Sequence, residues 1–154
     1  MKTKALALSL ALCFAGAVAA SAQSPQMGTW KLNEAKSHIP TGSIKNTTVV
    51  YTADGDNIKV TTDGTLADGT ANHTDWTGKL DGKPYPLTGD PNADQRSYTK
   101  VNDHTLTLAN SKAGKVVATA RIVISSDGKT RTVWLHSHNP AGKEVSSKAV
   151  YDKQ

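Results

Sequence analysis

Short turn signals recur along the chain after residue 50, and they constrain its fold more than any other feature. Most of them pair glycine with a small or acidic residue, which supplies the positive φ angles of tight hairpins. They are Ala53-Asp54-Gly55-Asp56, Ala67-Asp68-Gly69, Asp81-Gly82-Lys83, Asn102-Asp103-His104, Ala113-Gly114-Lys115, Asp127-Gly128-Lys129 and Ala141-Gly142-Lys143. A spacing of about 10–15 residues leaves room for one short strand between turns, so the pattern predicts an antiparallel meander.

Ten strands are predicted between these signals. They cover residues 28–33, 45–53, 57–66, 70–80, 83–88, 95–101, 104–111, 115–125, 130–139 and 144–153. Alternation is clearest in 115–125, where one face carries Val116, Ala118, Ala120, Ile122 and Ile124. Arg121 falls on the opposite face. No window has a sustained helical period, and the connection 34–43 has room for only about two helical turns.

The predicted fold class is all-β, an antiparallel up-and-down β-barrel of about 8–10 strands. A flat sheet of this many strands would leave two long edges unpaired, and closure removes both edges. A two-sheet β-sandwich is the alternative architecture.

The N-terminus has the three parts of a secretory signal peptide. Lys2 and Lys4 precede an apolar run from Ala5 to Val18, and the small-residue segment Ala19-Ala20-Ser21-Ala22 follows. The run is shorter than the roughly 20 residues of a membrane-spanning helix, so we expect no membrane anchor. Residues 1–22 are therefore predicted to be a signal peptide cleaved after Ala22, and the mature protein to be periplasmic or secreted.

Cleavage changes the chemistry of what remains. It removes Cys13, the only cysteine, and so excludes disulfides; the bulky Leu12 before Cys13 argues against a lipid anchor. Without Lys2 and Lys4 the 18 basic residues become 16 against 13 acidic residues, a net charge of +3. These charges alternate in sign along the chain and form no basic block, so the sequence does not predict binding to nucleic acid.

The composition of the mature region predicts a partly polar interior. It contains no phenylalanine, few leucines and many threonines. Such β-branched residues suit strands but fill little interior volume.

The two ends of residues 23–154 carry a family resemblance. The first strand reads Met27-Gly28-Thr29-Trp30-Lys31-Leu32, and the last reads Lys148-Ala149-Val150-Tyr151-Asp152-Lys153. This pair resembles the opening G-x-W strand and the closing V-Y strand of the calycin superfamily, which includes lipocalins and fatty-acid-binding proteins. The segment from Tyr85 to Asp94 is similar to one in small exported bacterial lipocalin-like proteins of unknown function.

The resemblance implies one lipocalin-like β-barrel domain over 23–154, in which Trp30 closes one end and Gly28 lets the backbone pass close beside it. Both roles are structural. The chain departs from the carboxylate-binding Arg-x-Tyr motif of fatty-acid-binding proteins, because Ala149 stands where the arginine is expected before Tyr151. Arg121 and Arg131 could replace that arginine only if they point inward, and the alternation in 115–125 places Arg121 outward.

Four residues are predicted to line an interior ligand pocket: Tyr151, Trp134, His136 and Tyr98. Trp134, His136 and His138 share one face of their strand, because residues two apart project together. Two imidazoles on one face also suggest a weak metal site, for which no third ligand is evident, so neither a metal site nor a cofactor is predicted.

The sequence predicts a binding protein rather than an enzyme. It has no Gly-x-Ser-x-Gly elbow, and its carboxylates lie almost entirely in turns, so no catalytic residue is assigned. We expect an exported barrel that binds a small, partly polar or amphipathic molecule. The alternative is a packed-core interaction or stress-associated barrel that acts through its rim and loops. No oligomeric state follows from the sequence.

Overall fold

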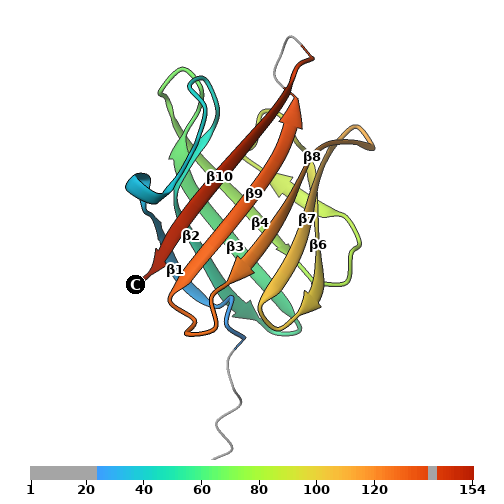
Figure 1. The fold of residues 1–154 in the computed structure, drawn as a ribbon. Coiled ribbons are helices and arrows are strands. Elements are labelled where there is room, and N and C mark those ends of the chain that lie inside the picture. Colours follow the sequence, from blue (N-terminus) through green and yellow to red (C-terminus); the bar gives the residue numbers. More distant parts are fainter. Residues whose placement is uncertain (1–23, 139–141) are drawn as a thin grey trace, which may run out of the picture.

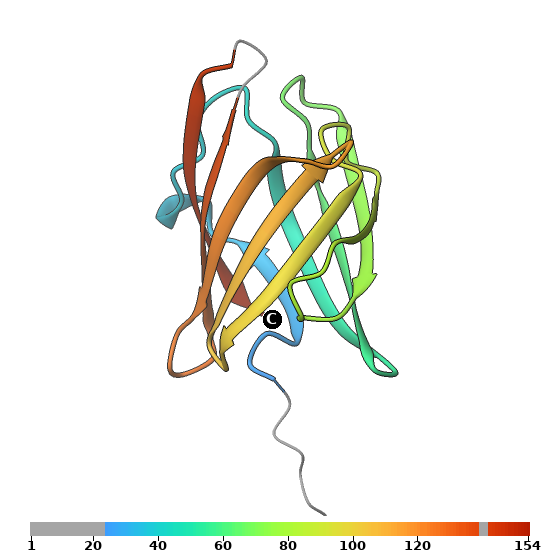
Figure 2. The same cartoon turned by 90° about the vertical axis from the view of Figure 1, so that its right-hand side faces the viewer.

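The computed structural model describes residues 24–138 and 142–154, and the predicted signal peptide 1–22 lies outside them. Ten strands follow one another along the chain, with one short helical element between the first two (Figures 1 and 2). The strands are β1 (Gly28–Leu32), β2 (Lys45–Asp54), β3 (Asn57–Thr65), β4 (Ala71–Gly78), β5 (Tyr85–Thr88), β6 (Gln95–Asn102), β7 (Thr105–Lys112), β8 (Lys115–Ile124), β9 (Thr130–His138) and β10 (Glu144–Lys153).

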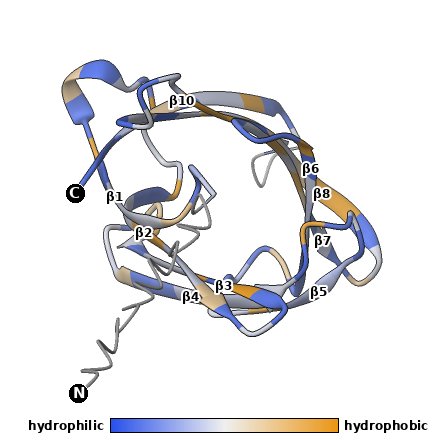
Figure 3. Ribbon diagram, turned by 90° about the horizontal axis from the view of Figure 1, so that it is seen from below, coloured by the Kyte–Doolittle hydropathy of each residue, from blue (hydrophilic) through white to orange (hydrophobic). Residues whose placement is uncertain are grey.

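The strands form one closed antiparallel barrel, which confirms the predicted fold class. Each strand pairs with its neighbours in sequence, and β1 completes the ring by pairing with both β2 and β10. Viewed along its axis the barrel is a continuous ring of strands (Figure 3). Because closure leaves no sheet edge, the sandwich alternative is not adopted.

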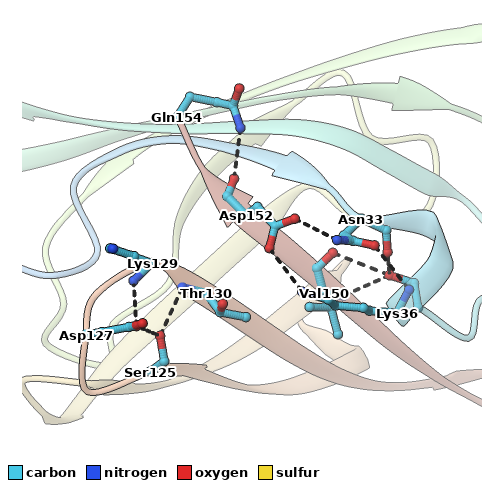
Figure 4. A network of polar contacts seen from close by, with 10 residues as sticks. Asn33, Lys36, Ser125, Asp127, Lys129, Thr130, Val150, Asp152 and Gln154 are labelled. Carbon is cyan, nitrogen blue, oxygen red and sulfur yellow. Dashed lines mark hydrogen bonds and ion pairs between the residues drawn. The ribbon is translucent and has the colours of Figure 1, made fainter.

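The connection between β1 and β2 contains a single 3₁₀ turn, η1 (Glu34–Lys36), so most of the available length is not helical. Asn33 caps this turn by accepting a hydrogen bond from the Lys36 backbone N–H. The Asn33 amide also donates to Asp152 on β10 at 2.6 Å, which ties the turn to the last strand (Figure 4). No helix in the described part of the chain is long and apolar enough to cross a membrane.

Trp30 lies in the main hydrophobic core and is fully buried. Its indole N–H donates to the carbonyl of Gln26 at 2.9 Å, so the chain segment before β1 packs beneath the ring. The Lys153 ammonium lies 5.0 Å from the centre of that ring. Gly28 has a φ of +108°, and a Cβ there would lie 3.1 Å from the Lys153 side chain. Glycine therefore lets the chain enter the barrel at this point without backbone strain.

The apolar side chains do not fill the barrel evenly. Within the described residues the largest buried side chains include Trp30, Trp76 and Tyr98. The indole N–H of Trp76 donates to the backbone carbonyl of Arg96. At the opposite end, β8 departs from the predicted pattern, because Val116 is 62% exposed beside a register shift at Asn110 and Ser111. The core is thus concentrated toward the end closed by Trp30.

A cluster of three titratable side chains, His73, Asp63 and Asp75, lies on the outer face of β3 and β4. His73 lies opposite Asp63, and its Nδ1 is 2.6 Å from an Asp63 carboxylate oxygen. Its Nε2 is 3.0 Å from Asp75. The hydrogen bond to Asp63 raises the pKa of His73, burial opposes this rise, and the hydrogen bond to Asp75 adds to it.

The raised pKa of His73 in this cluster predicts a pH-dependent contribution to the stability of the folded protein. The raised pKa means that folded protein holds the His73 proton more tightly than unfolded protein does. The stabilisation is therefore fully present below the unfolded pKa of about 6.5 and is lost as pH rises through the folded pKa. The Tm of wild type should exceed that of His73→Gln near pH 6, and the difference should shrink toward pH 9. A Tm difference that does not change with pH would contradict the assignment.

Candidate ligand-binding cavity

The barrel encloses a cavity of about 820 Å³. Its mouth lies at the end opposite Trp30 and is bordered by the connections around residues 39–44, 66–68 and 90–93. Its wall combines apolar side chains such as Leu108 and Leu135 with hydroxyl, amide and guanidinium groups. The interior is thus hollow and partly polar, as the threonine-rich composition predicts.

Arg131 is the most unusual residue in this wall. It is the second residue of β9, it is 4% exposed, and it points into the cavity. Its Nη2 donates to the Tyr51 hydroxyl at 3.1 Å. Its guanidinium carbon also lies 5.5 Å from the ring centre of Tyr51 and 5.0 Å from that of Tyr151. Three elements, β2, β9 and β10, therefore position one buried cation.

The tyrosines around Arg131 stabilise the guanidinium without neutralising it. Burial raises the pKa of Tyr51 and of Tyr151, against the opposing effect of Arg131, so both phenols are uncharged near neutral pH. The Tyr51 hydroxyl donates to that of Tyr98 at 3.4 Å, and the Tyr151 hydroxyl donates to the carbonyl of Asn46. The Nε of Arg131 is buried without a hydrogen-bond partner. A buried donor left without an acceptor costs about 1–3 kcal/mol.

A second cation, Arg96, lies on β6 in the wall of the same cavity. It is 9% exposed, and its Nε donates to the side-chain carbonyl of Asn110 at 2.7 Å. Its guanidinium carbon is 5.9 Å from the ring centre of Tyr98. Both interior arginines therefore have neutral partners.

The acidic groups of the cavity lie at its mouth. Among the described lining residues only Asp68 and Asp90 carry carboxylates, and both belong to connections between strands. Asp68 accepts hydrogen bonds from Thr70, and Asp90 accepts one from the Asn92 backbone N–H. The deeper wall is consequently electropositive.

The structure separates the four predicted pocket residues into two pairs. Tyr151 and Tyr98 are buried and line the cavity. Trp134 and His136 lie on the outer face of the barrel, so the expectation that they line the interior must be corrected. The tight turn after β8 determines this, because it places Trp134 opposite Arg121, which also faces outward.

Trp134 and His136 instead border a shallow outer groove of about 540 Å³ across β6 to β9. Small side chains such as Thr107 and Thr119 form its floor. The Nδ1 of His136 is 2.9 Å from the Ser146 hydroxyl and 3.6 Å from Glu144. No group of three or more metal-ligating side chains occurs among the described residues, so nothing in them completes a site with His136 and His138.

The sequence reasoning did not assign Arg131 or Arg96 to the pocket, although both line the cavity. The signal for Arg131 was present, because the Asp127-Gly128 turn pairs β8 with β9 and places Arg131 opposite the inward-facing Ile124. The alternation of β9 alone was ambiguous, since Val133, Trp134 and Leu135 put apolar groups on both faces. No comparable local signal marks Arg96.

The chain matches no protein-family model and no curated protein sequence. Among solved structures it is similar to lobster apocrustacyanin A1, with 14% identity and a TM-score of 0.44. That match covers 86% of this chain and spans only 63% of the apocrustacyanin chain. A redesigned β-barrel, mFAP1, bound to DFHBI is similar with 15% identity and a TM-score of 0.42, over 84% of this chain and 98% of that one.

The inward and outward positions of the two tryptophans predict different costs of truncation. Trp30→Ala should lower the free energy of unfolding by about 3–5 kcal/mol, because it opens a void in the buried core. Trp134→Ala removes a side chain that is 38% exposed and should cost about 1 kcal/mol or less. Urea denaturation followed through the remaining tryptophans measures both. Equal costs would contradict the assignment of faces.

Proposed function

We propose that this chain is an exported binding protein that holds a small amphipathic anion, of the carboxylate class, inside its barrel. The observation that carries the proposal is Arg131, a buried cation in the wall of the cavity with an unpartnered Nε and no acidic neighbour. A buried charge without a counter-ion destabilises a folded protein. A ligand carboxylate would accept from this guanidinium and offset that cost.

The remainder of the wall sets the shape of the proposed ligand. Between Arg131 and the mouth the cavity is lined by apolar groups that include Leu108, Val133 and Leu135. An apolar body attached to the anionic group would pack there and gain about 25 cal/mol for each Å² removed from water. The cavity volume lies within the range of about 300–1,000 Å³ that is typical of small-molecule sites.

The proposed activity is binding without chemical change or a cofactor. The polar groups beside Arg131 are phenols with raised pKa values, which keep their protons near neutral pH and do not act as bases there. The hollow interior also favours this function over the alternative of a packed barrel that acts only through its rim.

Calorimetry with decanoate and uncharged decanol tests the proposal. Arg131→Met should weaken decanoate binding about tenfold or more, because a charge-assisted hydrogen bond is lost, and leave decanol binding unchanged. Without ligand the variant should melt no lower than wild type, since a desolvated charge has been removed. Arg121→Met, on the outer face, is the matched control and should change neither affinity. If decanoate does not bind wild type, or binds Arg131→Met equally well, the proposal is wrong.

Export is the second part of the proposal, and it rests on the basic, apolar and small-residue pattern of residues 1–22. Full-length protein expressed in a Gram-negative host should be recovered from the periplasm or medium as a chain that begins at Gln23. Intact-mass spectrometry of each fraction measures this. An Ala22→Leu variant should accumulate uncleaved. Recovery of the full-length wild-type chain in the cytoplasm would refute export.

A further inference from the structure

The second interior arginine, Arg96, is held in the cavity wall by groups that orient it and leave its charge intact. Its Nε donates to Asn110, and its backbone carbonyl accepts from the indole N–H of Trp76. Asn110 Oδ1 is the only hydrogen-bond acceptor of the Arg96 side chain among the described residues. Since Arg96 has five N–H donors and spends one of them on Asn110, the Nη groups are left for another acceptor.

Asn110 makes this arrangement informative. It is buried, at 9% exposure, and it occupies the place where a carboxylate would form an ion pair with Arg96. An amide fixes the guanidinium plane through one hydrogen bond but contributes no negative charge. The rim carboxylates of Asp68 and Asp90 form no ion pair with Arg96, and each accepts hydrogen bonds within its own loop.

The two interior cations are connected through two tyrosines, Tyr98 and Tyr51. Arg96 lies beside the ring of Tyr98, the hydroxyls of Tyr98 and Tyr51 are 3.4 Å apart, and Tyr51 accepts from Arg131. Two phenols therefore separate the guanidinium groups. Arg96 is close to the mouth, since its strand begins just after the 89–94 connection, whereas Arg131 follows the turn at the opposite end.

We infer that the ligand carries two anionic groups joined by an apolar spacer, one on Arg131 and the other on Arg96. A dicarboxylate is the simplest member of this class. The inference rests on the proposed function and deepens it. A ligand with a single carboxylate would satisfy one guanidinium and leave the other without a counter-ion, and each uncompensated charge weakens the folded complex.

The test compares α,ω-dicarboxylates with monocarboxylates of equal length, from octane to hexadecane chains, by calorimetry. At the best length wild type should bind the dianion about tenfold or more tightly than the monoanion, as expected for one added charge-assisted contact. Arg96→Gln should remove this preference, because it should weaken dianion binding about tenfold more than monoanion binding. Asn110→Asp, which keeps Arg96 but pairs it with an acid of the same shape, should remove the preference as well. The outer-face variant Arg121→Gln is the control and should retain it.

The outcomes separate this inference from the function on which it rests. If monoanions bind through Arg131 but no dianion is preferred at any length, the inference is overturned and the proposed function stands. Equal weakening of monoanions and dianions by both variants would assign Arg96 a purely structural role and would also overturn the inference. If neither class of anion binds wild type, both proposals are wrong.

Discussion

The pairing of β1 with β10 is the constraint on which the rest of the structure depends. Ten short strands with few bulky apolar residues could not bury one face of a flat sheet, and an open sheet would leave two edges unpaired. In the closed barrel the inner faces of all ten strands surround one interior. A small number of large side chains around Trp30 can therefore close one end of that interior. The identity of every inward residue then follows from strand register.

Register explains how much of this molecule could be predicted from its sequence. The turn dipeptides located all ten strands to within a few residues, because tight hairpins need backbone conformations that few residues adopt. Which face points inward was predictable where apolar residues alternate cleanly, as in the second half of β8. The prediction of the inward face was wrong in β9, where apolar residues occur on both faces and Trp134 was assigned inward. Because the β8–β9 turn pairs Trp134 with Arg121, which faces outward, Trp134 faces outward as well.

The candidate site was only partly predictable for a different physical reason. Tyr98 and Tyr151 were predicted to line an interior pocket, and both lie in the cavity wall. The convergence of Tyr51, Arg131 and Tyr151 depends on side chains from β2, β9 and β10 meeting across a closed barrel. The contact between Tyr51 and Arg131 joins residues that are 80 positions apart in the chain, and it exists only after closure. Ala149 stands two residues before Tyr151, where the Arg-x-Tyr motif has its arginine, yet Arg131 reaches the same tyrosine from the neighbouring strand.

The thin core and the interior charges are two consequences of one composition. Threonine and alanine on inward positions leave space where leucine or phenylalanine would fill it, and that space is the cavity. The same composition leaves two buried guanidinium groups in the wall of that space, and the hydrogen-bond partners of both are neutral. On the proposed function, an apolar body that carries acidic groups would improve both the packing and the charge balance. A barrel of this composition is therefore expected to gain more stability from its ligand than one with a solid core would.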